Sequence, residues 1–446
     1  MHDLTTSWAG YISIAAFIIG YSLVVLEEKI HMRKSKPVIL AGCLMWFIIG
    51  SYEAMHGGES HSHHFIKELI AEIGELFFFL MSAMTYINTL AERNVFNYLR
   101  SWLLQKGLGF KQLFWSTGLI TFFLSPLADN LTSALLMSTV ALAVSSGNSR
   151  FIVLAFTNIV VAANAGGAWS PFGDITTLMV WTAGKVETLQ FSYLMLPSLV
   201  NWLVPALLMF PFLPNEVPET NTDVIELKPG AKVVIGLGVG TIATAVSFHQ
   251  FLHLPPFLGM MLGLGALMMF GYYLKRWGDR PTLKGKPVPD ELLDDTRRRF
   301  DIFKKIEGVE FDTLLFFFGV LTAVGALQYL GYLTLISQNL YGNPNIGPTW
   351  SNIAVGILSA IVDNIPVMFA VLKMDPTMGI DQWLMITLTA GVGGSLLSVG
   401  SAAGVAVMGV DRKNYTFFSH MKWSWTIAVG YVASIACWYF VTGSLR

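Results

Sequence analysis

The sequence predicts an all-α polytopic membrane protein in which about ten crossing helices and two re-entrant hairpins form two inverted-topology repeats. The 446-residue chain is 54% hydrophobic and only 13% charged, a composition far from that of soluble domains. Apolar stretches long enough to cross a bilayer recur from end to end. Two further apolar segments, one in each half, are interrupted by the same polar motif, Ser-x-x-x-Asp-Asn.

The N-terminal repeat is predicted over residues 1–214, where apolar runs alternate with polar connections. In order, we expect three spans, a hairpin that enters from the cytoplasm, a broken span and a last span: 9–26, 37–52, 68–90, 111–147, 150–183 and 190–213. The first run lacks a basic segment before it and a small-residue cleavage site after it. It is therefore expected to be a retained span and not a signal peptide.

The C-terminal repeat is predicted over residues 230–446, after a cytoplasmic linker at 215–229. Its elements follow the same order, except that the hairpin enters from the outside: 230–249, 254–275, 310–336, 349–373, 381–410 and 420–442. The charged segment 276–309 is expected to form a cytoplasmic loop.

The distribution of basic residues gives the orientation, because cytoplasmic loops collect Lys and Arg. If neither hairpin crosses the membrane, 24 of the 28 basic residues fall on one side. The other side holds only Lys67, Lys185, Lys373 and Arg446. We therefore place the 276–309 loop in the cytoplasm and both termini outside.

An internal repeat relates the two halves. The segment "SPLADNLTSALLM" from Ser125 matches "SAIVDNIPVMFAV" from Ser359, and "GGAWSPFGDITT" from Gly166 matches "GGSLLSVGSAAG" from Gly393. Upstream, "LFFFLMSAMTY" matches "LFFFGVLTAVG", in the same order. Each half has an odd number of crossings, so the second half enters the membrane from the opposite face, as is typical of secondary transporters.

Prolines and glycines interrupt the predicted helices at the repeated motifs. Irregular backbone at membrane depth is tolerated only where protein buries it or where it lines an aqueous cavity. Broken helices at the midplane free carbonyl oxygens and helix ends to bind ions. The interrupted segments are therefore the candidate transport site.

Three aspartates, Asp129, Asp174 and Asp363, lie at these predicted breaks. An ionised Asp at the bilayer centre costs about 2.5 to 3.5 kcal/mol, and such residues usually mark an ion or proton path. A carboxylate in a low dielectric holds a proton until a cation favours its charged form. Hydroxyl and amide side chains surround these positions, no basic side chain lies in the repeated motifs quoted above, and oxygen ligands suit hard cations. The alternative is that an Asp only caps a broken helix. It is weaker for Asp129 and Asp363, which the repeat pairs, than for Asp174, which pairs with Ser401.

The segments "SPLADNLTSALLM", "AANAGGAWSPFGDITTLMVW", "ELFFFLMSAMTYINTL" and "VDNIPVMFAVLKM" resemble those of NhaD-type sodium/proton antiporters of the ion transporter superfamily. The likeness covers nearly the whole chain. It implies exchange of Na+ or Li+ for protons across a bacterial inner membrane, a role in pH homeostasis, and both termini in the periplasm. It implies no cofactor and no enzymatic activity. The wider superfamily suggests a homodimer with a mobile domain that works as an elevator.

The resemblance also implies a set of site residues for cations and protons. The polar positions that match are Ser125, Asp129, Asn130, Asn164, Asp174, Thr176, Thr177, Ser359, Asp363, Asn364, Ser398 and Ser401. The transported Na+ is expected at the aspartates among them.

Two other groups of polar residues have competing interpretations. Glu72 and Glu75, one turn apart on the third span, form a proton path or lie at the membrane interface. The histidines of "HGGESHSHH" are a pH sensor, since histidine titrates near neutrality, or part of a solvated polar loop: His56, His61, His63 and His64.

Three other classes of function remain open to different degrees. A sodium-coupled symporter of an organic or inorganic anion would share the fold, but the dicarboxylate group carries Ser-Asn-Thr where this chain has Asp-Asn. A membrane enzyme is poorly supported, because neither a His-Glu-x-x-His motif nor a nucleophile elbow in a polar context is present. A passive channel would not need paired broken segments. The net charge of −1 argues against a nucleic-acid partner. Cys43 and Cys437 fall in predicted spans and indicate neither a disulfide framework nor a zinc site.

Overall fold

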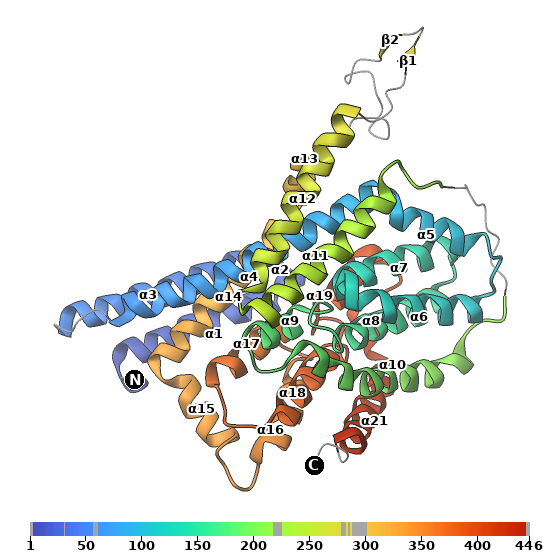
Figure 1. The fold of residues 1–446 in the computed structure, drawn as a ribbon. Coiled ribbons are helices and arrows are strands. Elements are labelled where there is room, and N and C mark those ends of the chain that lie inside the picture. The colour runs from blue at the N-terminus through green and yellow to red at the C-terminus, as the bar shows by residue number, and fades with distance from the viewer. Residues whose placement is uncertain are drawn as a thin grey trace. The chain divides into compact units, whose positions relative to one another are not determined.

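The computed structural model describes residues 3–30, 32–56, 61–145, 147–216, 225–277, 282–283, 286–287 and 301–442. Helices make up nearly all the regular structure of these residues (Figure 1), in agreement with the predicted all-α class. The exception is a short antiparallel ladder of β1 (Thr282–Leu283) and β2 (Lys286–Pro287).

The helices before residue 230 have these bounds: α1 Trp8–Val25, α2 Glu27–Ile30, α3 Ser35–His56, α4 His61–Glu92, α5 Val95–Leu104, α6 Phe110–Ala128, α7 Asn130–Val144, α8 Ser149–Gly167, α9 Ile175–Thr182, η1 Thr188–Leu194, α10 Met195–Met209 and η2 Phe210–Phe212. Those after it are α11 Ala231–Leu252, α12 Pro256–Trp277, α13 Ile302–Glu307, α14 Phe311–Leu330, α15 Tyr332–Leu340, α16 Gly347–Leu358, α17 Asn364–Met374, α18 Ile380–Gly393, α19 Ala402–Val410, α20 Phe417–Met421 and α21 Ser424–Thr442.

Among the described residues, eight helices are long and apolar enough to cross a membrane, so the chain is a multi-pass membrane protein. They fall in eight of the ten predicted crossings. The other two crossings are 9–26, where α1 is slightly shorter, and 381–410, which is divided into α18 and α19. The span predicted to reach residue 336 ends at Leu330, because Gly331 adopts a left-handed backbone with φ of 97° that stops a helix.

Contacts divide the chain into two compact units. The first consists of Met1–Ala71, Leu103–Asn221 and Leu315–Arg446, and the second of Glu72–Trp102 and Thr222–Leu314. This division interleaves segments from both halves of the sequence. The predicted repeat boundaries at 1–214 and 230–446 stay a prediction.

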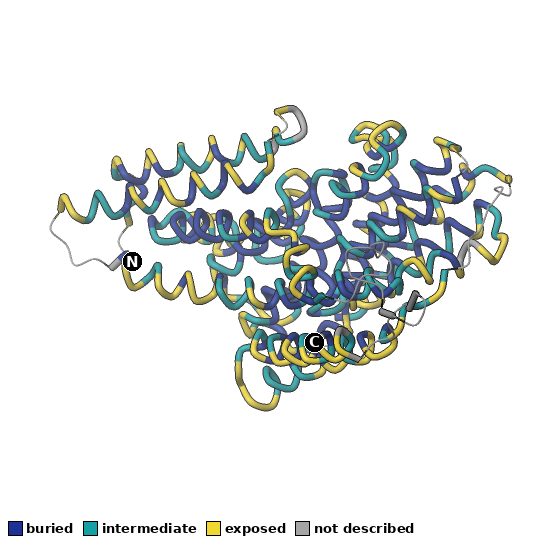
Figure 2. The backbone as a smooth tube through the Cα atoms, turned by 90° about the horizontal axis from the view of Figure 1, so that it is seen from above, coloured by how far each residue is buried: buried dark blue, intermediate teal, exposed yellow. Residues whose placement is uncertain are grey.

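In the first unit, helices from the two halves pack in corresponding pairs (Figure 1). α6, α7 and α8 pack on one another, as do α16, α17 and α18. Across the halves, α7 contacts α19, α17 contacts α9, and α10 contacts α21. α8 is buried along nearly its whole length, and Figure 2 shows buried stretches of backbone in dark blue against exposed helical turns in yellow. The break that follows α8 therefore lies in the core of this unit, whereas Asp129 and Asp363 are half-buried.

Glycines let α18 approach α16 closely. A Cβ atom added to Gly393 would lie 2.0 Å from the Gly356 carbonyl oxygen, which no side-chain movement can relieve. On the same helix, a Cβ at Gly391 would meet only the Ala168 Cβ, at 3.5 Å, an ordinary contact.

We therefore expect Gly393→Ala to lower the free energy of unfolding by about 1 to 3 kcal/mol, as overpacking does. Gly391→Ala is the matched control and should leave stability unchanged or slightly raised, because alanine favours the helix. Thermal unfolding of the purified variants in detergent measures both. Equal melting temperatures for the two variants would contradict the close packing of α16 and α18.

The second unit is organised around Tyr86 of α4. Its hydroxyl donates to the Gly263 carbonyl oxygen at 2.7 Å and accepts from Thr241 Oγ1 at 2.8 Å. Ser82, one turn earlier, donates to the Met260 carbonyl oxygen at 2.9 Å. These bonds join α4 to α11 and α12, and Leu264 and Leu267 complete the apolar core around them.

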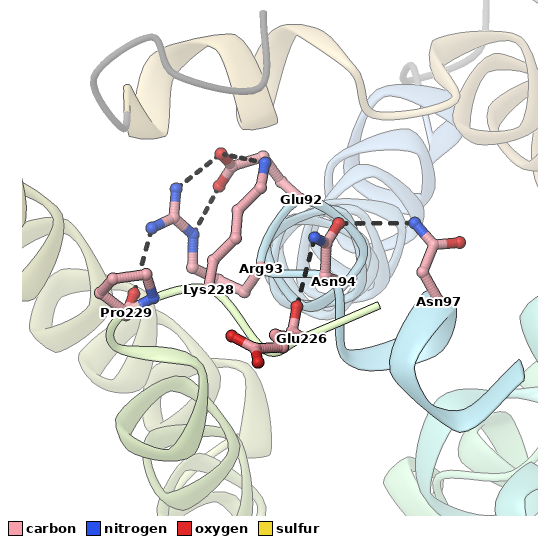
Figure 3. Close-up of polar contacts among 7 residues, drawn as sticks. All are labelled: Glu92, Arg93, Asn94, Asn97, Glu226, Lys228 and Pro229. Atoms are coloured by element: carbon pink, nitrogen blue, oxygen red, sulfur yellow. Dashed lines mark hydrogen bonds and ion pairs between the residues drawn. The ribbon is translucent and has the colours of Figure 1, made fainter. Parts of the chain in front are cut away.

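A charged cluster fixes the end of α4 to the segment before α11 (Figure 3). Arg93 donates to both carboxylate oxygens of Glu92, at 2.7 and 2.6 Å, and to the Pro229 carbonyl oxygen at 3.2 Å. Lys228 lies 3.7 Å from the same Glu92 carboxylate. Asn94, in a left-handed backbone conformation with φ of 61°, ends the helix and donates to the Glu226 carbonyl oxygen. This cluster has a structural role within the second unit.

Candidate functional site

The first repeated motif places Asp129 between α6 and α7. Its φ of 57° is a conformation that non-glycine residues rarely adopt. Strained backbone of this kind is often found at functional sites. Its carboxylate accepts the Thr132 amide at 2.9 Å and the Thr132 hydroxyl at 3.0 Å. Asp129 thus caps α7, as a carboxylate at a helix N-terminus does.

The second motif places Asp363 at the start of α17, where one carboxylate oxygen accepts the Ile365 amide at 3.4 Å. The other oxygen, Oδ2, lies 3.1 Å from the Lys34 ammonium. This ion pair was not predicted from the sequence, because Lys34 lies outside the repeated motifs. Lys34 belongs to the distant turn before α3, and nothing in its sequence context indicates the contact.

The downstream breaks place Asp174 and Ser401 in equivalent positions. Asp174 caps α9 with φ and ψ of −150° and 151°, and Ser401 caps α19 with −147° and 151°. Asp174 accepts the Thr176 amide at 3.0 Å, and Ser401 Oγ accepts the Gly404 amide at 3.2 Å. The capping interpretation therefore holds geometrically for all three aspartates, and it leaves one oxygen of Asp174 and one of Asp363 for other partners.

Asp174 is the point where the two halves of the chain meet. Its free oxygen, Oδ2, accepts the Asn130 side-chain amide at 2.8 Å and the Asn364 side-chain amide at 3.0 Å. Asn130 and Asn364 are the paired asparagines of the two motifs. The Asp174 residue is only 3% exposed, so these two donors replace water around a buried carboxylate.

Asn164 of α8 extends this network into the second half. Its oxygen accepts from Asn130 Nδ2 at 3.0 Å, and its Nδ2 donates to Ser395 Oγ at 2.8 Å and Ser401 Oγ at 2.9 Å. All of these residues are buried. The structure therefore joins Asn130, Asn164, Asp174, Asn364 and Ser401 by hydrogen bonds.

The remaining predicted Ser and Thr residues differ in the hydrogen bonds that their hydroxyls make. Ser125 donates to the Ala163 carbonyl oxygen at 2.7 Å, and Ser359 donates to the Ala390 carbonyl oxygen at 2.8 Å. Thr177 donates to the Asp174 carbonyl oxygen at 2.7 Å. The buried hydroxyls of Thr176 and Ser398 have no hydrogen-bond partner among the described residues, so both can still bind a ligand.

The three aspartates do not form one ligand cluster among the described residues. The groups around Asp174 are instead amides and hydroxyls. Oxygens of this kind suit a hard monovalent cation better than a transition metal.

The other predicted polar groups lie elsewhere. Glu72 and Glu75 belong to the second unit, where Glu72 is exposed and Glu75 half-buried. His56, His63 and His64 are exposed; His56 contacts the Tyr52 carbonyl oxygen at 2.8 Å, and His64 lies 3.3 Å from Glu68. The side chain of His61 lies outside the described residues.

His420 of α20 was not identified from the sequence, and it supports the network from outside the candidate spans. Its Nε2 lies 2.9 Å from the Ser395 carbonyl oxygen and its Nδ1 lies 2.6 Å from the Tyr415 hydroxyl. A neutral ring satisfies both contacts, as an Nε2–H donor and an Nδ1 acceptor. With a partner at each ring nitrogen, this histidine holds the Ser395 backbone.

Comparisons with known proteins give the family of the chain. A family model described as "Citrate transporter" matches residues 21–393. The chain is 50% identical to the Na(+)/H(+) antiporter NhaD of Vibrio cholerae over 97% of its length and 92% of the relative. It is 51% identical to the Na(+)/H(+) antiporter NhaD of Halomonas elongata over 97% of its length and 88% of the relative. It is 33% identical to sodium/proton antiporter 1 of Arabidopsis thaliana over 95% of its length and 71% of the relative. With half of its residues identical to the bacterial relatives over nearly its entire length, the chain belongs to the family of NhaD-type sodium/proton antiporters.

Proposed function

We propose that this protein is a secondary active transporter that exchanges Na+ or Li+ for protons across a bacterial inner membrane. One observation carries the proposal: a buried carboxylate, Asp174, accepts one amide from each half of the chain, from Asn130 and from Asn364. A movement of either half changes the surroundings of this carboxylate. Such a group can couple a conformational change to the exchange of one bound cation for another.

The chemistry of exchange follows from competition. A buried carboxylate binds a proton when no metal ion is present, because burial disfavours its charged form. Na+ or Li+ favours the charged form, so its arrival releases the proton. If a single group holds either ion but not both, the two fluxes run in opposite directions. Asp129, Asp174 and Asp363 are the proposed carriers, and the free hydroxyls of Thr176 and Ser398 are proposed ligands for the metal ion.

The inverted repeat is supported by matched contacts in the two halves. Ser125 and Ser359 make the same bond, to the carbonyl oxygens of Ala163 and Ala390. These two alanines are paired when the match of Gly166 with Gly393 is extended three residues upstream. A Cβ at Gly166 would lie 2.3 Å from the Phe122 carbonyl oxygen. In the other half, a Cβ at Gly393 would lie 2.0 Å from the carbonyl oxygen of Gly356, the residue that pairs with Phe122. Helices α6–α7 and α16–α17 are the two proposed re-entrant hairpins. The periplasmic termini, the homodimer and the elevator movement belong to the same proposal.

The test is proton movement driven by sodium in everted membrane vesicles or proteoliposomes. Adding Na+ or Li+ should dissipate an imposed proton gradient with the parent protein. Asp129→Asn and Asp363→Asn should abolish this response, because an amide cannot exchange a proton for a cation. Asp375→Asn is the matched control: Asp375 ends the helix that Asp363 begins, is exposed, and has a left-handed backbone that asparagine accepts.

The outcome separates antiport from symport. If Na+ moves no protons but drives uptake of an organic or inorganic anion, the protein is a symporter and the aspartates are helix caps. If Asp129→Asn and Asp363→Asn both keep the parent response, neither of these two carboxylates is a carrier.

A further inference from the structure

We propose that the Lys34 ammonium binds the Asp363 carboxylate in place of the transported cation and thereby lowers the affinity of the protein for Na+ and Li+. The inference rests on the proposed exchange function and names a residue that sets the cation affinity of that exchange. Lys34 Nζ lies 3.1 Å from Asp363 Oδ2, and the two side chains are 18% and 11% exposed.

The two oxygens of Asp363 have separate partners. Oδ1 accepts the Ile365 amide at the start of α17, and Oδ2 faces the ammonium. The Ile365 amide that donates to Oδ1 belongs to the backbone, so this hydrogen bond stays in place. A metal ion that binds Asp363 therefore has to displace Lys34 from Oδ2.

The surroundings of the ammonium favour a cation. Lys34 Nζ lies 4.2 Å from the centroid of the fully buried Phe316 ring, and an aromatic face attracts a positive charge. Val362 and Pro366, close to Asp363 in the chain, line an apolar cavity of about 710 Å³. The low polarity on that side strengthens the attraction between the two charges.

Among the described residues, the paired aspartate of the other half has no such counter-ion. The Asp129 carboxylate accepts groups of its own helix turn, among them the Thr132 amide and hydroxyl. The repeat therefore supplies two related carboxylates, and Lys34 neutralises only one of them. Its charge remains attached to the protein, so it competes with the transported ion without being transported.

The experiment measures the Na+ and Li+ concentrations that give half-maximal proton movement in proteoliposomes at alkaline pH, with choline chloride keeping the ionic strength constant. Lys34→Gln removes the competing charge and should lower the half-maximal concentration about tenfold, equivalent to about 1.4 kcal/mol. Lys34→Arg keeps the charge, and its guanidinium can bind a carboxylate with two bonds, so its half-maximal concentration should exceed that of the parent. Lys36→Gln is the matched control, since Lys36 is exposed two residues away.

The results distinguish this inference from the proposed function. If the parent does not move protons with either ion, the exchange function itself is wrong. If the parent is active and Lys34→Gln has the same half-maximal concentration as Lys36→Gln, Lys34 does not compete. If Lys34→Gln does not fold, Lys34→Arg decides: a half-maximal concentration above that of the parent supports the proposal, and one equal to or below it overturns the proposal.

Discussion

Replacing Asp174 by serine should abolish sodium-driven proton movement while leaving the fold intact. Serine already caps α19 at the equivalent Ser401 with nearly the same backbone angles, so the start of α9 should form normally. The variant loses the carboxylate that binds the cation and the proton. It also removes the shared acceptor of Asn130 and Asn364. Hydrogen bonds to a charged group contribute about 1.5 to 3 kcal/mol each to stability, so the variant should fold but melt at a lower temperature than the parent.

Two measurements check this result. Proton movement in proteoliposomes gives the activity, and the rise in melting temperature on adding Na+ gives binding directly, because a ligand of the folded state stabilises it. Asp301→Ser is the control, since Asp301 also caps a helix, α13, by accepting the Phe303 amide and lies in the other unit. Full activity in Asp174→Ser would show that Asp174 is only a cap.

The sequence was sufficient to predict where the helices of the site would end. The Asp-Asn pair separates α6, which ends at Ala128 and contains Pro126, from α7, which starts at Asn130, and residues 359–363 lie outside helices between α16 and α17. These are local effects of backbone chemistry and capping. The approximate positions of the apolar helices followed in the same way from composition.

The relative importance of the aspartates could not be predicted from local patterns. The repeat paired Asp129 with Asp363 and left Asp174 without an acidic partner, so Asp174 had the weaker argument. In the structure, Asp174 collects the amides of both motifs, because Asn364 reaches it over 190 residues of sequence. The contact of Lys34 with Asp363 spans 329 residues. Such pairings depend on how helices from the two halves pack, which periodicity and capping do not specify.

The paired asparagines provide the second large effect. Asn130→Ala and Asn364→Ala each remove one N–H donor from Asp174 Oδ2. Fewer donors favour the protonated carboxylate, so Na+ should compete less well with the proton. We expect the half-maximal Na+ concentration near neutral pH to rise about tenfold or more in each variant, for the loss of about 1.5 kcal/mol or more per bond. The defect should shrink as the pH rises, because the competing proton becomes scarce. Proton movement measured over a range of pH tests this, with the exposed Asn339→Ala as control.

The effects of the two substitutions should differ in size, because Asn130 has a second hydrogen-bond partner. Asn130 also donates to Asn164, which holds Ser395 and Ser401, so Asn130→Ala should have the larger effect. Because both asparagines act on the same oxygen, the double variant should not be worse than Asp174→Ser, and the single effects should not add. A normal Asn364→Ala beside an impaired Asn130→Ala would mean that only the Asn164 network matters. The meeting of the two halves at Asp174 would then be a packing contact, and the coupling of exchange to their movement would have to reside in Asp129 and Asp363.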